Sequence, residues 1–165
     1  MKVVPPVKRS WTQVVANGDL ICVNTYSGYR RSSMDDSQPE FILEPDVSNQ
    51  MLGESLLSCL SASRFLSPDE IETFFALDVV QRRYVEWVAR LNAKHGYQNK
   101  RALFKEMMRC LAKREGNTIT ISPTHHAKLE GWSGDGMDGK DVVVSAHNTL
   151  EEIGIALREA FTRCT

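Results

Sequence analysis

The sequence predicts an α+β fold: a single domain with a mixed or antiparallel sheet of about six strands and helices packed on it. Three patterns support this. In Thr118–Ile121, polar and apolar β-branched residues alternate, which is the period-two pattern of a strand with one buried face. Near the start of the chain, Asn17-Gly18 separates two apolar runs, which is a strong hairpin signal. Between residues 79 and 95, apolar side chains recur at the spacing of an amphipathic helix.

The strands are expected in the following order. Residues 10–16 and 20–23 form the opening hairpin, with a type I′ turn at Asn17-Gly18 that needs positive φ at both residues. Residues 26–38 are polar and predict an exposed loop, and residues 41–43 make a short third strand. Alternation in 107–115 favours a strand, although its composition also suits a helix; it turns at Gly116 into Thr118–Ile121. Residues 141–145 give the last strand.

Capping residues mark where the helices begin. The N-cap candidates are Ser48, Ser67, Asn99 and Thr149. Pro68 follows Ser67 at the first helical position, and Glu152 completes a capping box with Thr149. The long helix, from Val79 to about His95, ends at Gly96. Its charged residues lie largely off the apolar stripe: Arg82, Arg83, Glu86 and Arg90.

The two ends of the chain resemble each other at a constant offset. Ser48, Leu52-Gly53, Leu56 and Leu60 match Thr149, Ile153-Gly154, Leu157 and Phe161. This predicts two strand-strand-strand-helix halves, 1–66 and 107–165, around a helical insertion at 67–106, although amphipathic helices also resemble one another by construction. Because glycine inside a helix costs roughly 1 kcal/mol relative to alanine, Gly53 and Gly154 are expected to allow close approach of each helix to the sheet.

Composition is that of an ordinary globular protein, with 42% hydrophobic and 25% charged residues and a formal charge of -1. The near-neutral charge and dispersed arginines argue against a nucleic-acid reader. The N-terminal residues 1–6 lack the apolar core of an export signal, so we expect a cytoplasmic protein with four reduced, mostly buried cysteines. No phosphate loop, nucleophile elbow or zinc-binding helix motif occurs. His125 with Asp135 or Glu130 could make an acid/base pair, but nothing nominates a nucleophile beside them.

Two polar loops carry the candidate binding residues. Each contains Met-Asp, and each supplies acidic side chains for a possible shared acidic surface: Asp35, Asp36 and Glu40 in one, and Asp135, Asp138 and Asp141 in the other. For either loop alone, a solvated surface with no partner is the alternative interpretation. The adjacent His125 and His126 invite a metal site, but no third ligand lies at the usual spacing. One histidine packing on Trp132 or bonding a turn carbonyl is the preferred interpretation.

The middle and end of the chain resemble the CdiI family of immunity proteins from bacterial contact-dependent growth inhibition systems. The resemblance rests on Lys100–Lys105, Thr118–His126, Leu129-Glu130, Trp132–Gly136 and Glu151–Gly154, and extends more loosely over Arg9–Cys164. The most specific part comprises Ser122, Pro123, Thr124, His125, His126, Trp132, Ser133, Gly134 and Asp135. These motif residues serve either the fold or binding. Residues 26–46 resemble the family least and are expected to carry partner specificity.

The resemblance implies a small cytoplasmic protein that binds and blocks the C-terminal toxin domain, often a nuclease, of a large surface effector. It implies no catalytic residues, cofactor, metal, direct nucleic-acid contact or membrane insertion, and a monomer is favoured. Because covering a cationic nuclease groove suits an acidic patch with aromatic anchors, the expected toxin-binding residues are Asp35, Asp36, Glu40, Tyr29, Trp132, Asp135 and Asp138. The alternatives are a small metal- or histidine-dependent enzyme and a dimerising scaffold module.

Overall fold

The computed structural model describes residues 4–165, so the sequence prediction about an export signal in residues 1–6 falls partly outside it. Nine strands and five helices follow one another within that part of the chain. They are β1 Ser10–Ala16, β2 Ile21–Gly28, β3 Ser32–Met34, β4 Glu40–Leu43, α1 Asn49–Ala62, α2 Pro68–Phe74, α3 Leu77–His95, α4 Lys100–Phe104, β5 Met108–Glu115, β6 Thr118–Pro123, β7 His125–Lys128, β8 Gly131–Ser133, β9 Val142–Ser145 and α5 Leu150–Thr162.

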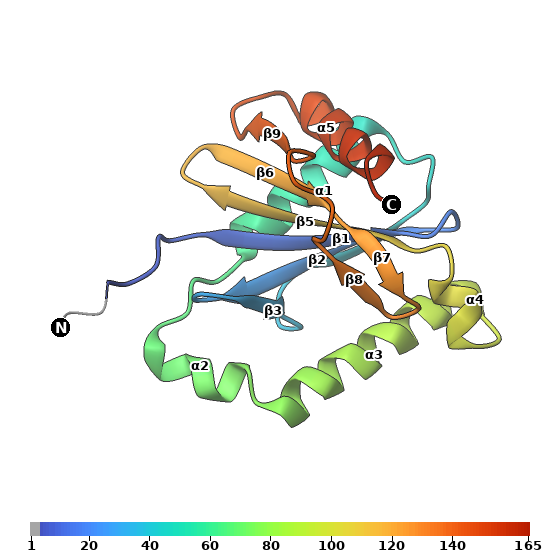
Figure 1. Cartoon of the computed structure of the whole chain (residues 1–165), viewed down its shortest axis with the longest axis horizontal. Helices are drawn as coiled ribbons and strands as arrows, with labels where there is room; N and C mark the ends of the chain where they lie inside the picture. The colour runs from blue at the N-terminus through green and yellow to red at the C-terminus, as the bar shows by residue number, and fades with distance from the viewer. Residues whose placement is uncertain (1–3) are drawn as a thin grey trace.

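Seven strands form one antiparallel sheet, and β7 and β8 form a separate two-stranded ribbon (Figure 1). The order in the large sheet is β3-β2-β1-β5-β6-β9, with β4 also paired to β2. The predicted α+β class is therefore confirmed, and the sheet is antiparallel rather than mixed. The sequence undercounted the strands because β3, β7 and β8 are short and lack an apolar alternation; residues 26–38 are not the predicted exposed loop, since they contain the end of β2 and all of β3.

The opening hairpin is present, but its turn is not the predicted type I′. The Asn17 amide donates to the Leu20 carbonyl at 3.3 Å, so Gly18 and Asp19 are the central residues. Of these two residues, Gly18 alone has a positive φ, of 92°, which is the pattern of a type II′ turn. The Asn17 side-chain oxygen accepts the amide hydrogens of Asp19 and Leu20 at 3.0 and 3.2 Å, so this asparagine closes the turn from its edge.

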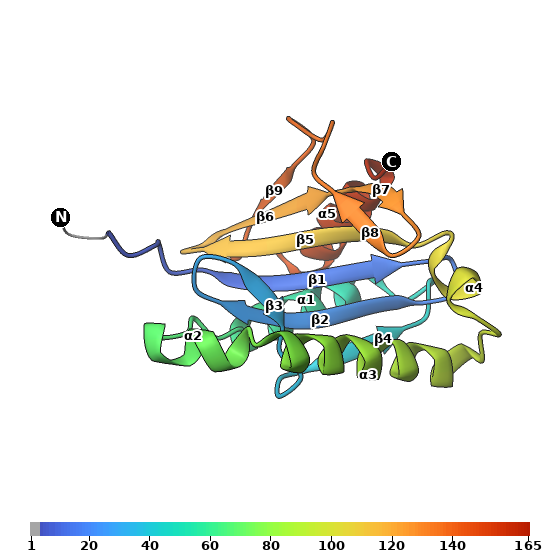
Figure 2. The same ribbon diagram turned by 60° about the horizontal axis from the view of Figure 1, so that its bottom comes forward.

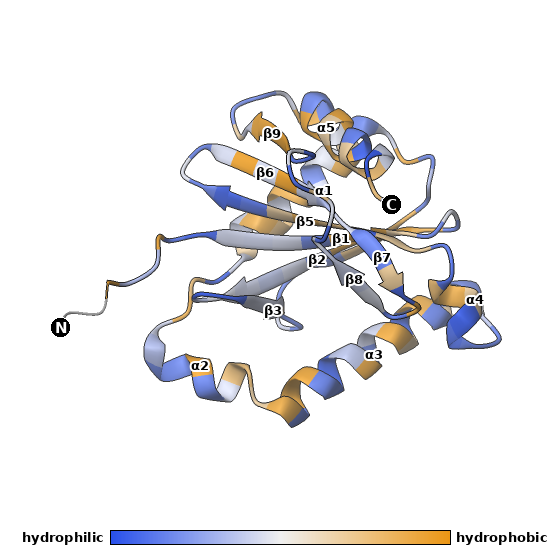
Figure 3. Ribbon diagram, viewed as in Figure 1, coloured by the Kyte–Doolittle hydropathy of each residue, from blue (hydrophilic) through white to orange (hydrophobic). Residues whose placement is uncertain are grey.

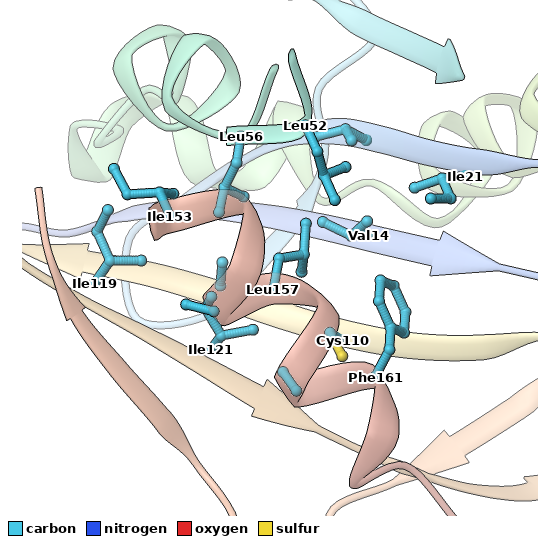
Figure 4. Close-up of a cluster of buried hydrophobic side chains, with 14 of the residues drawn as sticks. Val14, Ile21, Leu52, Leu56, Cys110, Ile119, Ile121, Ile153, Leu157 and Phe161 are labelled. Atoms are coloured by element: carbon cyan, nitrogen blue, oxygen red, sulfur yellow. The ribbon is translucent and has the colours of Figure 1, made fainter. Parts of the chain in front are cut away.

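The main core lies between the sheet and the helix pair α1 and α5, which share one face of it (Figure 1). Ile119 and Ile121, the apolar members of the alternating stretch, are fully buried there. Figure 4 shows them beside Val14, Leu56 and Leu157 from neighbouring elements. Burying a side chain of this size contributes about 1.5–3 kcal/mol relative to exposing it, so this layer supplies much of the stability.

The two helix glycines allow helix-to-helix contact, not the predicted helix-to-sheet contact. A Cβ atom placed on Gly53 in α1 would lie 2.0 Å from the Leu150 carbonyl oxygen at the start of α5. A Cβ atom placed on Gly154 in α5 would lie 1.9 Å from the Asn49 carbonyl oxygen at the start of α1. Each helix backbone therefore rests on the first turn of the other, in a reciprocal contact that only glycine fits.

The opposite face of the sheet is covered by the helical insertion and the ribbon. Figure 2 shows α3 running along the sheet beside β2 and β4, and Figure 3 shows apolar and polar bands alternating along this helix. Its buried residues are Arg83, Trp87 and Leu91. Trp87 and Leu91 pack with Phe104 and Met107 in a second cluster. The prediction that Arg83 lies off the buried stripe is wrong, for a reason given by its ion pair below.

The halves of the chain show corresponding arrangements. β1, β2, β4 and α1 in the first half have the same order along the chain as β5, β6, β9 and α5 in the second. β1 and β5 pair at the centre of the sheet, while β4 and β9 lie towards its two sides. All four cysteines are free, and Cys22, Cys59 and Cys110 are buried. Among the helices of residues 4–165, none combines the length and apolar character needed to cross a bilayer.

Candidate functional site

The carboxylates of the first acidic loop are internal anchors. Asp35 is only 3% exposed, and its carboxylate accepts hydrogen bonds from Arg64 Nε at 2.8 Å and from Ser27 Oγ and Ser37 Oγ at 2.6 Å. Burial by itself raises the pKa of the Asp35 carboxyl, but the hydrogen bonds from Arg64, Ser27 and Ser37 outweigh burial and hold its pKa below the ordinary value. Its accessible surface is too small for a direct role in binding.

Asp36 and Glu40 tie α3 to the sheet. Asp36 forms ion pairs with Arg82 at 3.3 Å and Arg83 at 3.1 Å, and Glu40 forms one with Arg90 at 2.7 Å. Arg83 is buried because this ion pair satisfies its charge. It also donates to the Phe74 carbonyl at 2.9 Å, and its guanidinium lies 4.2 Å from the centre of the Phe74 ring.

Tyr29, the aromatic candidate of this loop, is half-buried. Its ring lies 5.4 Å from the Phe65 ring, and the Arg30 guanidinium lies 5.5 Å from its centre. The outer side of the ring is therefore shared with an exposed arginine. Of the four candidate binding residues between positions 29 and 40, only Asp36 is exposed, and its carboxylate already forms an ion pair with Arg83.

The second acidic loop keeps its carboxylates on the surface. Asp135, Asp138 and Asp141 are exposed, and none of them forms an ion pair within residues 4–165. The loop is nevertheless fixed to the rest of the protein. Met137 is buried, and Arg163 donates hydrogen bonds to the carbonyls of Lys140 and Asp141 at 3.0 and 3.2 Å. The first loop packs on α3 and the second on the end of α5, so the two sets do not merge into the single acidic surface that the sequence suggested.

The histidine motif forms the ribbon, where a surface loop was predicted. β7 and β8 pair through His125 opposite Ser133 and His126 opposite Trp132. The His126 ring stacks on Trp132, with centroids 4.8 Å apart, and its Nε2 lies 2.9 Å from the Leu129 carbonyl oxygen, so the preferred packing interpretation is confirmed. His125 Nδ1 lies 2.8 Å from Thr165 Oγ1. No group of three or more potential metal ligands exists among the residues that the structure describes.

Other motif residues fix the base of the ribbon to the sheet. Pro123 ends β6 opposite Cys110, and Ser122 pairs with Leu111. The Thr124 hydroxyl donates to the Arg109 carbonyl at 2.6 Å, and the His126 amide donates to the Thr165 carbonyl at 2.8 Å. Gly134 is exposed, and a Cβ atom there would meet nothing within 4 Å. The motif thus chiefly sets where the ribbon leaves the sheet.

Trp132 anchors the ribbon over α4. Its indole N–H donates to the Met107 carbonyl at 2.9 Å, and its ring lies 6.1 Å from the Phe104 ring. We expect Trp132→Ala to lower the free energy of unfolding by about 2 kcal/mol, because a half-buried aromatic loses its packing and its hydrogen bond together. Urea unfolding followed by circular dichroism measures this. Trp132→Phe keeps the ring and loses only the N–H, so it should cost about 1 kcal/mol; an alanine variant as stable as the parent would contradict this anchoring role.

A pocket opens between the ribbon, α3 and the face of the sheet opposite α1 and α5. This ribbon pocket has a volume of about 340 Å³ and is lined by Gln13, Tyr26, Met34, Tyr84, Trp87, Arg109, Glu130, Gly131 and Trp132. Beside it, and sharing Tyr26, is a hollow of about 270 Å³ that Arg31 and Lys113 also line. Among the lining residues, sequence reasoning gave a binding role only to Trp132. The available signal was Gln13, a long polar side chain directly before the apolar Val14-Val15 of β1.

A wider hollow between α2 and α3 offers less binding chemistry. It measures about 530 Å³ and is lined by three arginines, Arg64, Arg82 and Arg83, with Asp69 and Glu70. Each of these guanidiniums is already paired with Asp35 or Asp36. The ribbon pocket and the exposed second acidic loop, by contrast, carry polar groups that have no ion pair or hydrogen-bond partner within residues 4–165.

Comparisons with known proteins agree on one family. The sequence profile described as CDI immunity protein (CdiI) matches residues 10–164. The immunity protein CdiI-YPIII of Yersinia pseudotuberculosis serotype O:3 (strain YPIII) is 43% identical over 171 residues, covering 96% of this chain and 97% of that protein. A structure of a CdiA-CT/CdiI toxin and immunity complex from Yersinia pseudotuberculosis matches with a TM-score of 0.90 and 40% identity, over 96% of this chain and 99% of that one. A protein of unknown function, NMB0488 from Neisseria meningitidis, matches with a TM-score of 0.91 and 36% identity, over 99% of this chain and 100% of that one.

Proposed function

This chain belongs to the CDI immunity protein (CdiI) family, and from that premise we propose that it binds and neutralises the C-terminal toxin domain of a cognate contact-dependent growth inhibition effector. The observation that carries the proposal is the match, over nearly the whole of both chains, to the structure of a toxin and immunity complex from Yersinia pseudotuberculosis. Protection by binding needs a rigid surface and no turnover. The proposed role is therefore that of a cytoplasmic inhibitor without catalytic activity.

The exposed negative charges of the second acidic loop support a contact between this loop and the toxin. Asp135 and Asp138 are exposed, and the loop that carries them is held in place by Met137 and Arg163. An ordered negative patch speeds association with a cationic partner surface, and the substrate groove of a nuclease is such a surface. We place Asp135 and Asp138 in the contact, with Asp36, Glu40, Tyr29 and Trp132 contributing through what their ion pairs and packing leave exposed.

Co-expression with the toxin domain of the effector encoded beside this chain tests the function. We expect the chain to restore growth to cells that produce the toxin and to co-purify with it. Growth arrest despite normal production of both proteins, together with no complex on mixing the purified proteins, would rule the proposal out.

Charge reversal tests the place of contact. Asp135→Lys combined with Asp138→Lys is expected to slow association with the toxin by roughly 10-fold at low salt, and the difference should shrink at high salt because screening weakens exposed charges. Glu44→Lys with Glu54→Lys is the matched control, since it makes the same change in net charge at exposed positions next to and on α1. Stopped-flow association rates measure both. Equal rates for the two double variants would remove the acidic loop from the contact.

A further inference from the structure

The ribbon pocket contains hydrogen-bond donors that have no acceptor among residues 4–165. Gln13 is 4% exposed, and its side-chain oxygen accepts the Tyr26 hydroxyl at 2.8 Å, which leaves the Nε2 amide hydrogens buried without a partner. Arg109 Nε is likewise buried and without a partner. The indole N–H of Trp87, a third lining residue, is also buried without a partner. Buried polar groups are almost always hydrogen-bonded in folded proteins, so three unsatisfied donors lining one pocket need a physical explanation.

Arg109 also brings a positive charge that no carboxylate of residues 4–165 neutralises within ion-pair distance. The guanidinium lies near the Tyr26 hydroxyl: burial raises the pKa of Tyr26, and the charge of Arg109 opposes that rise. Glu130, the one acidic residue lining the pocket, is bound to groups other than Arg109. It accepts the Tyr84 hydroxyl at 2.6 Å and lies 3.4 Å from Lys100 Nζ.

Several elements hold these donors in place. Gln13 lies on β1 opposite Leu111 of β5, and Arg109 lies on the same strand β5 opposite Val15. The Arg109 carbonyl is fixed by the Thr124 hydroxyl at the base of the ribbon. Because both residues lie on the central pair of strands, their backbone positions are fixed before a ligand binds, and only their side chains have to adjust.

We infer that the ribbon pocket receives a carboxylate side chain, aspartate or glutamate, from the bound toxin domain, and that Arg109 and Gln13 donate hydrogen bonds to it. A carboxylate supplies the acceptor oxygens that both donors lack and the negative charge that Arg109 lacks. The inference rests on the proposed function, and it gives the contact a second point, of opposite charge, in addition to the second acidic loop. Two contacts of opposite sign fix the orientation of a partner more strictly than one.

Affinity measurements with the purified toxin domain test this. Arg109→Leu is expected to weaken binding by roughly 30-fold or more, because it leaves the toxin carboxylate buried without its charge partner. Gln13→Leu should weaken binding by about 5-fold, and because it also removes the acceptor of the Tyr26 hydroxyl, the melting temperature of the free variant is measured beside its affinity. Arg109→Lys keeps the charge without the Nε donor and should fall between Arg109→Leu and the parent. Arg101→Leu, which removes an exposed arginine from α4, is the control and should bind as the parent does.

A double-mutant cycle identifies the occupant. Each aspartate and glutamate of the toxin is changed to asparagine or glutamine and measured against the parent, Arg109→Leu and Arg109→Lys. We expect to find one toxin carboxylate whose removal weakens binding to the parent protein but weakens binding to Arg109→Leu little further. If Arg109→Leu does not fold, the cycle with Arg109→Lys decides in its place.

The outcomes separate the two proposals. If the parent protein does not bind the toxin, the proposed function fails. If the parent binds but the Arg109 variants bind equally well, or if every toxin carboxylate is additive with them, the carboxylate pocket is overturned and the proposed function stands.

Discussion

Replacing Gly53 or Gly154 with alanine is expected to lower the free energy of unfolding by about 3 kcal/mol, one of the two largest effects on stability predicted for a single substitution. An alanine Cβ would lie about 2 Å from a carbonyl oxygen of the facing helix, well inside contact distance. The obstacle is backbone in the first turn of α5 or α1, which cannot rotate away as a side chain can. The helices must move apart, and the core beneath Leu52, Leu56 and Leu157 must open with them.

The sign of this effect is informative, because alanine in an open helix position stabilises by about 1 kcal/mol relative to glycine. For a chain of this size the loss corresponds to a fall of roughly 6–12 °C in melting temperature, measurable by calorimetry. Gly134→Ala is the matched control: it has nothing within 4 Å of the new methyl group and should leave the melting temperature unchanged. Alanine variants at Gly53 and Gly154 that melt with the parent would show that the helices do not touch as described.

Asp35→Asn is expected to lower the free energy of unfolding by about 2–3 kcal/mol at neutral pH. The buried carboxylate accepts hydrogen bonds from four donors: the side chains of Arg64, Ser27 and Ser37 and the Ser37 amide. The neutral amide loses the charged contact with Arg64 and places an N–H₂ group where an acceptor is needed. Arg64 is partly exposed, and water can recover some of the loss on its side. Asp135→Asn makes the same chemical change at an exposed carboxylate without an ion pair and should stay within about 0.5 kcal/mol of the parent.

Asp35 also predicts how stability depends on pH. Its folded-state pKa lies below the ordinary value near 3.8, so the folded form binds its proton less readily than the unfolded form. The stabilisation is therefore complete above about pH 5 and is lost as the pH falls through the ordinary value towards the folded pKa. Denaturant unfolding between pH 3 and pH 7 should show a flatter acid limb for Asp35→Asn than for the parent. Parallel pH profiles for the two proteins would mean that the pKa of the Asp35 carboxyl is the same in the folded and unfolded states.

These effects show a division of labour between the acidic residues. Asp35, Asp36 and Glu40 hold Arg64, Arg82, Arg83 and Arg90, and so fix the helical insertion and the end of α1 against the sheet. Asp135 and Asp138 are left to the solvent. An inhibitor that works by shape needs both groups, because a surface can be complementary to a partner only if the layer beneath it does not shift.

Local sequence patterns predicted most of the regular elements. The caps at Ser48, Asn99 and Thr149 accept the expected backbone hydrogen bonds, and Ser67 with Glu70 opens α2 as expected. The strand from Thr118 buries Ile119 and Ile121, and His126 packs on Trp132. Each of these depends on residues within a few positions of one another, so the information is present in a short window of sequence.

The type of turn at Gly18, the strands β3, β7 and β8 and the burial of Arg83 were not predicted. Each depends on a partner distant in the chain or on the register of a strand pair. Arg83 is buried only because Asp36 lies against it, and β3 exists only because β2 offers it an edge. A polar segment carries no period of its own, so tertiary pairing decides its conformation.

By itself the sequence determined the α+β class, the position of the helices and the membership of an immunity-protein family, because caps, periodicity and the motif at 122–135 are local and additive signals. Only the tertiary structure decided which carboxylates face the solvent, what the two helix glycines touch, and that Gln13 and Arg109 line one pocket. The physical reason is that the free energy of a charged or polar side chain depends on what surrounds it, and those surroundings come from strands and helices far apart in the chain.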